Sequence, residues 1–264
     1  FKDPEQLLNE VNPDLICIAT RTPQRFQLIE LCIKNGVRLL HVEKPLCNSY
    51  SQLMQIAKMI ERTKAHFTFG AIRRYLAPYK NSIKLLNQGL IGDLEEVSFN
   101  LGRTILCWDH IHGIDLIQSI LSPFKINAIR AVSRNHIIKG TNGNILDGDP
   151  EIAFIHFSTI NGPQGIISCA GGNDLMFYGN NGIIGVTNDG SDCYCRKPFD
   201  ENKKSYWNNT FKIEIPEDKY SGTASALDRL VNSNPKLAKE DSYEMINSQK
   251  LLFACVQSIL SNGN

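Results

Sequence analysis

Continuous apolar runs alternate with amphipathic segments at the start of the chain. Pro13–Thr20 has the character of a strand buried on both faces, and Arg38–Val42 and Phe67–Ala71 are shorter runs of the same kind. Between these runs, Pro23 opens one segment with apolar residues at helical spacing, and Ser49 opens another. The order strand, helix, strand, helix, strand predicts right-handed crossovers and a partial, doubly wound parallel sheet of the Rossmann type.

Short strand-like runs joined by tight turns dominate the chain after Arg74. Turn residues occur at Asn161-Gly162 and at Asn180-Asn181-Gly182. Helical periodicity is found near 78–87 and 109–121, and two helices, about 224–232 and 239–261, close the chain. The expected strands are Val97–Leu101, Ile126–His136, Ile152–Thr159, Gly165–Ala170, Met176–Tyr178 and Gly182–Thr187. This pattern predicts an α+β unit with an open, mainly antiparallel sheet and helices on one face.

Two domains are expected from this change of pattern. Residues 1–72 are predicted to be the C-terminal half of a dinucleotide-binding Rossmann domain. Residues 73–264 are predicted to be an α+β domain for substrate binding and dimerisation, with the last helix packed back on the first domain. Dinucleotides place their pyrophosphate on a glycine-rich first turn. Because the sequence has no G-x-G-x-x-G motif, either the cofactor half lies upstream of Phe1 or the protein binds no dinucleotide.

Composition argues against several other classes of function. The 264 residues carry a formal net charge of +1 and their basic residues are scattered, so nucleic acid is not an expected partner. No apolar run approaches the roughly 20 residues that cross a bilayer, so no membrane partner is expected. The eight cysteines lack zinc-site spacing, and several lie in apolar runs. A cytoplasmic protein with reduced cysteines and no metal is therefore expected.

Five short motifs follow one another along the chain: Ile18-Ala19-Thr20, Val42-Glu43-Lys44-Pro45, Arg73-Arg74-Tyr75, Gly89-Leu90-Ile91-Gly92 and His112-Gly113-Ile114-Asp115-Leu116. In this order they resemble the Gfo/Idh/MocA oxidoreductases, which include glucose–fructose oxidoreductase and inositol dehydrogenase. The resemblance covers nearly the whole chain. In that family a glycine-rich βαβ unit comes first, so the resemblance implies a chain lacking the N-terminal part of its Rossmann domain. It also implies NAD or NADP as the cofactor, bound weakly without that segment.

The resemblance places Lys44 at the nicotinamide end of the cofactor, near the substrate hydroxyl that loses its proton. An ammonium there stabilises a developing alkoxide and can share in proton transfer. Glu43 would orient Lys44 or pair with it, and Pro45 would fix the turn after the strand. The alternative is that these three residues are only the polar end of a strand.

His112 is the expected proton acceptor, because imidazole titrates near neutral pH. Enzymes that resemble inositol dehydrogenase often carry an aspartate four residues before this histidine, where this chain has Trp108. Either Asp109 substitutes for that aspartate through a local shift, or the protein relies on Lys44 and His112 alone. The alternative for His112 is a helix histidine satisfied by a neighbour.

Further residues are assigned to the cofactor and the substrate by the same resemblance. The expected cofactor contacts are Ala19, Thr20, Arg21, Thr22, Glu43, Lys44, Pro45 and Arg73. The expected substrate contacts are Arg74, Asp115, Trp108 and Tyr178. Arg73 and Arg74 could equally form salt bridges between the domains. Tyr178 could instead face the core or a second subunit, and the loop at Thr20 could be an ordinary strand-to-helix connection.

Together these expectations describe an NAD(P)-dependent oxidoreductase that transfers hydride between nicotinamide and a hydroxyl-bearing carbon. Its substrate would be a sugar, a cyclitol or a nucleotide sugar, and the protein would supply positioning and charge. The resemblance implies a homo-oligomer paired through the second sheet. The rival hypothesis is a non-catalytic or truncated family member that serves as a dimerising or ligand-binding module. The missing glycine-rich turn and Trp108 favour this rival.

Overall fold

Three parallel strands form the first sheet of the structure, a computed structural model that describes residues 1–135, 144–198 and 209–262. The strands lie in the order β1 (Leu15–Ile18), β2 (Leu39–Val42) and β3 (His66–Phe69). Helix α1 (Pro4–Val11) precedes them, and α2 (Thr22–Lys34) and α3 (Tyr50–Arg62) form the crossovers. Ile18, Val42 and Phe69 lie side by side at the carboxyl ends. The loops that follow these strands therefore meet at one edge of the sheet.

Eight strands form the second sheet, in the order β11-β10-β9-β8-β4-β7-β6-β5. Their bounds are β4 (Leu94–Asn100), β5 (Ile126–Ser133), β6 (Ile152–Thr159), β7 (Gln164–Ser168), β8 (Asp174–Gly179), β9 (Gly182–Thr187), β10 (Asp192–Lys197) and β11 (Asn209–Lys212). Neighbouring strands are antiparallel except for β4 and β7, which are parallel. The predicted fold class is confirmed: a partial doubly wound sheet is followed by an open, mainly antiparallel one.

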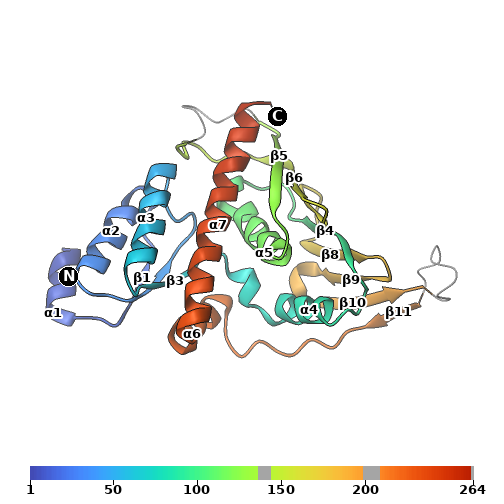
Figure 1. The fold of residues 1–264 in the computed structure, drawn as a ribbon, viewed down its shortest axis with the longest axis horizontal. Helices are drawn as coiled ribbons and strands as arrows, with labels where there is room; N and C mark the ends of the chain where they lie inside the picture. Colours follow the sequence, from blue (N-terminus) through green and yellow to red (C-terminus); the bar gives the residue numbers. More distant parts are fainter. Residues whose placement is uncertain (136–143, 199–208, 263–264) are drawn as a thin grey trace.

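Helices cover one face of the second sheet (Figure 1). The helical elements after β3 are η1 (Ile72–Tyr75), α4 (Ala77–Asn87), η2 (Leu106–His110), α5 (Ile111–Leu121), η3 (Asn188–Gly190), α6 (Gly222–Asn232) and α7 (Pro235–Leu260). Along β8, Phe177 is fully buried under this layer, whereas its neighbour Tyr178 points to the opposite face. Gly113 lets α5 pack closely, because a Cβ there would come 2.6 Å from Leu101 Cδ1 and that side chain would have to move.

Helix α7 runs between the two sheets and is hydrogen-bonded to both (Figure 1). The backbone N–H of Phe67 in β3 donates to Ser242 Oγ at 2.9 Å, and a second serine of α7 binds β5 in the same way. The backbone N–H of Leu46 donates to Gln249 Oε1 at 2.8 Å. Helix α7 thus fixes the turn after β2 relative to the second sheet. The domain division at residue 72 itself stays a prediction.

The structure differs from the predicted elements in several places. Helix α1 and strands β10 and β11 were not predicted. The strand predicted over Ile126–His136 ends at Ser133, and residue 136 lies outside the described residues. The helix predicted from Asp109 begins at Ile111, because residues 106–110 form a π-helical turn. Among the described residues, no helix combines the length and apolar character needed to cross a membrane.

Candidate active site

A pocket of about 520 Å³ opens at the carboxyl ends of β1 and β2. Ligands of doubly wound sheets bind at this edge, and the volume lies within the range of small-molecule sites. The walls come from the loop after β1, the turn after β2, the π-helical turn and residues 146–149. Seven residues singled out from the sequence line it: Ala19, Thr20, Arg21, Thr22, Lys44, Pro45 and Trp108.

Lys44 reaches from the turn after β2 to the π-helical turn. Its Nζ donates a hydrogen bond to the carbonyl oxygen of Trp108 and lies 3.9 Å from the centre of the Trp108 ring. Burial lowers the pKa of Lys44, whereas the nearby carboxylates of Glu43, Asp109 and Asp149 act to raise it. The result is a partly desolvated ammonium with acidic neighbours, held at the mouth of the pocket.

Glu43 holds the backbone of the turn that carries Lys44. The backbone N–H of Lys44 donates to Glu43 Oε2 at 3.2 Å. Gly70, just after β3, leaves room for this carboxylate, because a Cβ there would come 2.6 Å from Glu43 Oε2. The peptide bond between Lys44 and Pro45 is cis. Glu43 thus contacts the backbone of Lys44, and its role in orienting the ammonium stays a prediction.

The π-helical turn η2 sets the positions of Trp108 and Asp109. The backbone N–H groups of Asp109 and His110 both donate to the Ile105 carbonyl, each at 3.2 Å. The bond from His110 to Ile105 spans five residues, whereas an α-helical bond spans four, so this turn holds one residue more than an α-helical turn. The sequence left open a local shift that would let Asp109 replace an aspartate at position 108. The extra residue lengthens the turn, whereas Asp109 lies one residue closer to His112 than the expected aspartate, so the π-helical turn does not supply that shift.

Two hydrogen bonds fix this turn from outside. The backbone N–H of Cys107 donates to Asp149 Oδ1 at 2.6 Å, which satisfies one of the free N–H groups at its start. The hydroxyl of Thr104 donates to the carboxylate of Asp109. Asp149 therefore anchors the start of the turn, and Thr104 holds the Asp109 carboxylate, whose charge acts on Lys44.

His112 lies in the first turn of α5, and its Nδ1 is buried without a hydrogen-bond partner in the described part of the chain. Burial lowers the pKa of His112 to about 3, and the charges of Arg73 and Lys44 add to this effect. Asp109 acts in the opposite direction. The imidazole is thus neutral near pH 7, but with this lowered pKa it is a weaker base than the near-neutral imidazole expected from the sequence. Because Lys44 and Asp109 both influence it, the three expected catalytic residues share one electrostatic neighbourhood.

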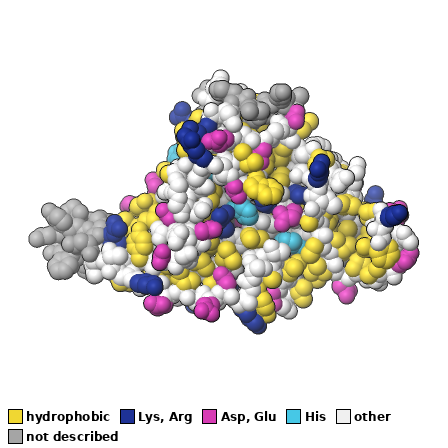
Figure 2. Space-filling view, turned by 180° about the vertical axis from the view of Figure 1, so that it is seen from behind, with side chains coloured by type: hydrophobic (Ala, Val, Ile, Leu, Met, Phe, Trp, Pro, Cys, Tyr) yellow, Lys and Arg dark blue, Asp and Glu magenta, His cyan; other side chains and the backbone are white. Residues whose placement is uncertain are grey.

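The space-filling view agrees with such a gathering of charge. Histidine, basic and acidic side chains meet near the middle of one face, with apolar side chains around them (Figure 2). Surfaces of this kind, where titratable groups of different types meet, are frequent at functional sites.

Acid should destabilise the protein partly through His112. Because the pKa of His112 is lowered from 6.5 to about 3 in the fold, the proton binds preferentially to the unfolded chain, and stability falls as the pH drops through that window. For His112→Gln, we expect the loss of unfolding free energy between about pH 6.5 and pH 4 to be smaller by on the order of 3 kcal/mol. Urea denaturation at a series of pH values measures this difference. His156→Gln, in β6, controls for the substitution itself, and an acid dependence equal to the wild type's in His112→Gln would contradict the prediction.

Arg73 forms an ion pair with Asp189 close to His112. Its Nη2 and Nε each lie 3.2 Å from Asp189 Oδ1, and the Tyr79 hydroxyl donates to the same oxygen at 3.1 Å. The guanidinium also lies over the ring of Phe99. Arg73 thus joins η1 to η3, and both residues of this ion pair lie within residues 73–264, so it does not bridge the two predicted domains. Arg73 does not line the Lys44 pocket, and its contact with the cofactor stays a prediction.

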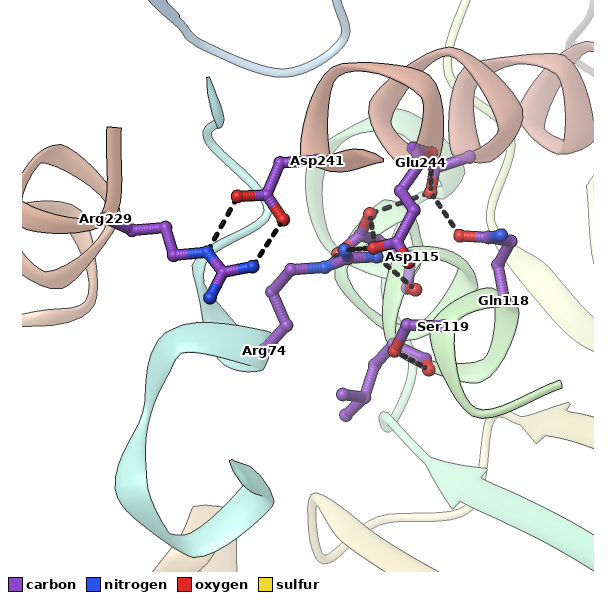
Figure 3. A network of polar contacts seen from close by, with 9 residues as sticks. Arg74, Asp115, Gln118, Ser119, Arg229, Asp241 and Glu244 are labelled. Atoms are coloured by element: carbon purple, nitrogen blue, oxygen red, sulfur yellow. Dashed lines mark hydrogen bonds and ion pairs between the residues drawn. The ribbon is translucent and has the colours of Figure 1, made fainter. Parts of the chain in front are cut away.

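Arg74 and Asp115 bind each other in a buried network (Figure 3). Arg74 Nε donates to Asp115 Oδ2 at 2.5 Å and Nη2 donates to Oδ1 at 2.9 Å. Ser248 of α7 donates to the same carboxylate at 2.7 Å, and Arg74 also contacts Glu244. Burial alone would lower the pKa of Arg74, but the carboxylates of Asp115 and Glu244 raise it overall. The structure therefore uses these two expected substrate contacts to join η1, α5 and α7.

A second cavity, of about 800 Å³, lies on the Arg74 side of the molecule between α4, α6 and α7. It shares no lining residue with the Lys44 pocket. Its walls carry charges of both signs, and no strand of the parallel sheet ends there. We place the candidate active site in the smaller pocket, because the parallel strands end there and Lys44 lines it, although Asp109 and His112 are not among its lining residues.

Tyr178 lies on the uncovered face of the second sheet. In β8 it sits between two buried residues, Phe177 and Gly179, and it pairs with Glu96 of β4 and Ile183 of β9. Side chains alternate between the faces of a strand, so Tyr178 points away from the helix that carries His112. The structure does not bring this expected substrate contact to the pocket.

Among the pocket residues that were missed from the sequence, Arg25 and Asp149 make polar contacts that hold the pocket together. Arg25 is a charged residue, yet it is only 6% exposed. It lies among the apolar residues on the buried side of α2, and this position was the only sign in the sequence that it could have a role in the pocket. Asp149 was taken as part of a loop before a strand, yet its carboxylate binds the π-helical turn. Its role depends on a contact across 42 residues of chain, which no local pattern predicts.

The first part of the chain matches a known protein family. Residues 1–71 match the Gfo/Idh/MocA family, described as an oxidoreductase family with an NAD-binding Rossmann fold. The match confirms the resemblance expected from the sequence and covers the three parallel strands. No curated protein matches the chain in sequence.

Solved structures extend the likeness of fold to the rest of the chain. An inositol dehydrogenase homolog of Azotobacter vinelandii, complexed with NADH and myo-inositol, is 12% identical with a TM-score of 0.78, over 100% of this chain and 82% of that one. An oxidoreductase of Sinorhizobium meliloti is 14% identical with a TM-score of 0.78, over 100% and 83%. An aldose–aldose oxidoreductase of Caulobacter crescentus, complexed with glycerol, is 15% identical with a TM-score of 0.72, over 98% and 81%. At these identities the comparison establishes the shared fold.

Proposed function

We propose that this protein is an NAD(P)-dependent oxidoreductase that transfers hydride between nicotinamide and a hydroxyl-bearing carbon. The observation that carries the proposal is the position of Lys44 in a pocket at the ends of parallel strands, with Asp109 close enough for its charge to act on Lys44 and both residues close enough for their charges to act on His112. An ammonium, a carboxylate and a neutral imidazole are suitable groups for removing a proton from a hydroxyl. The match of residues 1–71 to an NAD-binding oxidoreductase family supports the proposal.

The pocket suits the nicotinamide end of a dinucleotide. Thr20 Oγ1 is buried at its wall and has no hydrogen-bond partner in the described ranges, so a bound ligand would satisfy it. The backbone of Thr20–Thr22, with Lys44 and Pro45, would hold that end of the cofactor. When bound, nicotinamide supplies the hydride acceptor or donor. Because the sequence has no glycine-rich turn for the pyrophosphate, we expect this chain to bind NAD(P)H weakly.

The chain's own residues manage the proton in this proposal. In the direction of oxidation, the neutral imidazole of His112 accepts the hydroxyl proton, and the Asp109 carboxylate balances the resulting positive charge. The Lys44 ammonium faces the same oxygen and stabilises negative charge that develops on it. Asp109 lies three residues before His112, and its charge acts on the imidazole, so we assign it the supporting role that the expected aspartate would have.

The proposed substrate is a sugar, a cyclitol or a nucleotide sugar. Trp108 is 64% exposed beside Lys44, which is unusual for so large an apolar ring. Its face suits the C–H face of a polyhydroxyl ring, while Lys44 and Asp149 supply a donor and an acceptor for hydroxyl groups. The related structures that contain myo-inositol and glycerol support this substrate class.

Energy transfer from Trp108 to NADH tests the cofactor part of the proposal. The chain has two tryptophans, so a Trp207→Phe variant leaves Trp108 as the sole donor. We expect saturable quenching that requires NADH well above micromolar concentration. Thr20→Val should weaken it further, whereas Thr187→Val, in β9, should not. Micromolar affinity would contradict the expected weakness, and a signal that does not saturate at millimolar NADH would contradict the site.

The open face of the second sheet is the proposed contact between subunits. Ile166 of β7, Met176 and Tyr178 of β8, and Ile183 of β9 point to this face, with β4 lying between β7 and β8. Apolar sheet faces are commonly covered in stable assemblies. We expect sedimentation velocity to show a dimer or a larger assembly, and Ile166→Glu to shift it to monomers. A monomeric wild-type protein would contradict this contact.

A non-catalytic ligand-binding module is the second candidate function. The observation that favours it is the Lys44 ammonium, which is engaged by the carbonyl and the ring of Trp108. Under this alternative, NADH or a sugar binds but no turnover occurs at saturating cofactor. Turnover that depends on Lys44 would exclude it.

A further inference from the structure

The guanidinium of Arg25 joins the two strand ends that form the pocket. Arg25 lies on α2, and its Nε and Nη2 donate to the Thr20 carbonyl at 2.9 and 2.6 Å. Its Nη1 donates to the Glu43 carbonyl at 2.9 Å and also to the Pro45 carbonyl. One side chain thus binds the loop after β1 and both sides of the residue that carries the ammonium.

This arrangement depends on the shape of the arginine side chain. A planar guanidinium presents several donors in a fixed fork, so it can serve three carbonyl groups from two loops at once. Carbonyl groups at buried strand ends need partners, and no side chain with a single donor could satisfy all three. The backbone on both sides of Lys44 is therefore held by Arg25, a buried residue that lines the pocket.

The charge of Arg25 also reaches Lys44. Burial lowers the pKa of Lys44 most, and the positive charge of Arg25 lowers it further. The carboxylates that face the ammonium, from Glu43, Asp109 and Asp149, act in the opposite direction. Burial lowers the pKa of Arg25, and the negative charge of Glu43 offsets part of that effect. Arg25 therefore influences the ammonium through both geometry and charge.

We propose that Arg25 is the positioning residue for Lys44: by binding the carbonyl groups of Thr20, Glu43 and Pro45, it holds the ammonium at the pocket, against Trp108. The inference rests on the proposed function, because it makes the pocket geometry of that reaction depend on α2. Arg25 itself contacts backbone rather than a reacting atom. Its effect on the reaction passes through Lys44.

Competitive labelling of lysine with acetic anhydride tests this inference. Peptide mass spectrometry of the full chain gives the labelling rate of Lys44 as a function of pH. In Arg25→Gln the midpoint of this profile should move to higher pH, because a nearby positive charge and part of the burial are lost together. The limiting labelling rate at high pH should rise several-fold, because the amino group of Lys44 is no longer held against the Trp108 carbonyl.

Two further variants complete the test. Arg25→Lys keeps the charge but lacks the fork, so the limiting rate should rise while the midpoint moves less. Arg38→Gln removes an exposed arginine at the opposite end of β2 and should change neither quantity. If Arg25→Gln does not fold, Arg25→Lys decides the question through the limiting rate.

A purely structural role would lower the unfolding temperature of the Arg25 variants and leave the Lys44 profile unchanged, and that result would overturn the inference. The labelling needs neither cofactor nor substrate. Failure of the proposed reaction would therefore appear as absent NADH binding or absent turnover, while the labelling profile reports on Arg25 alone.

Discussion

Lys44→Met should slow the oxidation of a polyhydroxyl substrate by about 10²- to 10⁴-fold while leaving the fold intact. The substitution removes the ammonium but keeps most of the apolar length of the side chain beside the Trp108 ring. Charge stabilisation acts on the transition state, so kcat should fall much more than KM changes. Steady-state kinetics with sugars and cyclitols at millimolar NAD⁺ or NADP⁺ gives both quantities.

The matched control for this prediction is Lys34→Met. Lys34 is an exposed lysine in the last turn of α2, away from the strand ends that form the pocket. Its loss should leave kcat within about a factor of two, as expected for an exposed residue outside the site. Equal effects of the two substitutions on kcat would remove Lys44 from the reaction and favour a ligand-binding module.

Asp115→Ala should destabilise the protein by about 3–5 kcal/mol. Asp115 is 2% exposed and pairs with the buried guanidinium of Arg74, which its loss would leave with only Glu244 as a charged partner. The hydroxyl of Ser248 would also lose an acceptor. Urea denaturation near neutral pH measures the change in unfolding free energy.

Two comparisons separate this effect from a general loss of charge. Glu151→Gln breaks the more exposed ion pair with Arg134, of 2.9 Å, and should cost only about 0–1 kcal/mol. The double variant Arg74→Met, Asp115→Leu should be less destabilised than Asp115→Ala, because no buried charge remains unpaired. If Asp115→Ala keeps full stability and instead raises KM, the residue contacts substrate as first expected from the sequence.

The parallel sheet could be predicted because its strands are short, mainly apolar runs, and that signal is local. Leu15–Ile18 is apolar throughout and Leu39–Val42 is apolar apart from His41. The expectation that the first strand is buried on both faces was wrong, because Cys17 is exposed. The turn with Lys44 then follows from the strand end, and topology places it at the edge where ligands bind. The lining of the pocket by residues from Ala19 to Thr22 follows from the same reasoning.

The rest of the site depends on contacts that the sequence does not encode locally. The π-helical turn continues an apolar pattern that also fits an α-helix, so the position of Asp109 could not be derived. Arg74 and Asp115 carry types of side chain that suit a substrate, but they are 41 residues apart and the structure pairs them. Arg25 looks like an ordinary helix residue until its three carbonyl partners are brought together.

The most direct test of the account is a double-mutant cycle on hydride transfer. The purified protein is incubated with millimolar NAD⁺ or NADP⁺ and C-deuterated myo-inositol or glucose, and mass spectrometry measures deuterium in the reduced cofactor. If Lys44 and His112 act on one substrate oxygen, Lys44→Met, His112→Gln and the double variant should lose similar amounts of transfer, because groups that act as a unit are not additive. Losses that multiply in the double variant, or a wild-type protein that transfers no deuterium, would contradict the account.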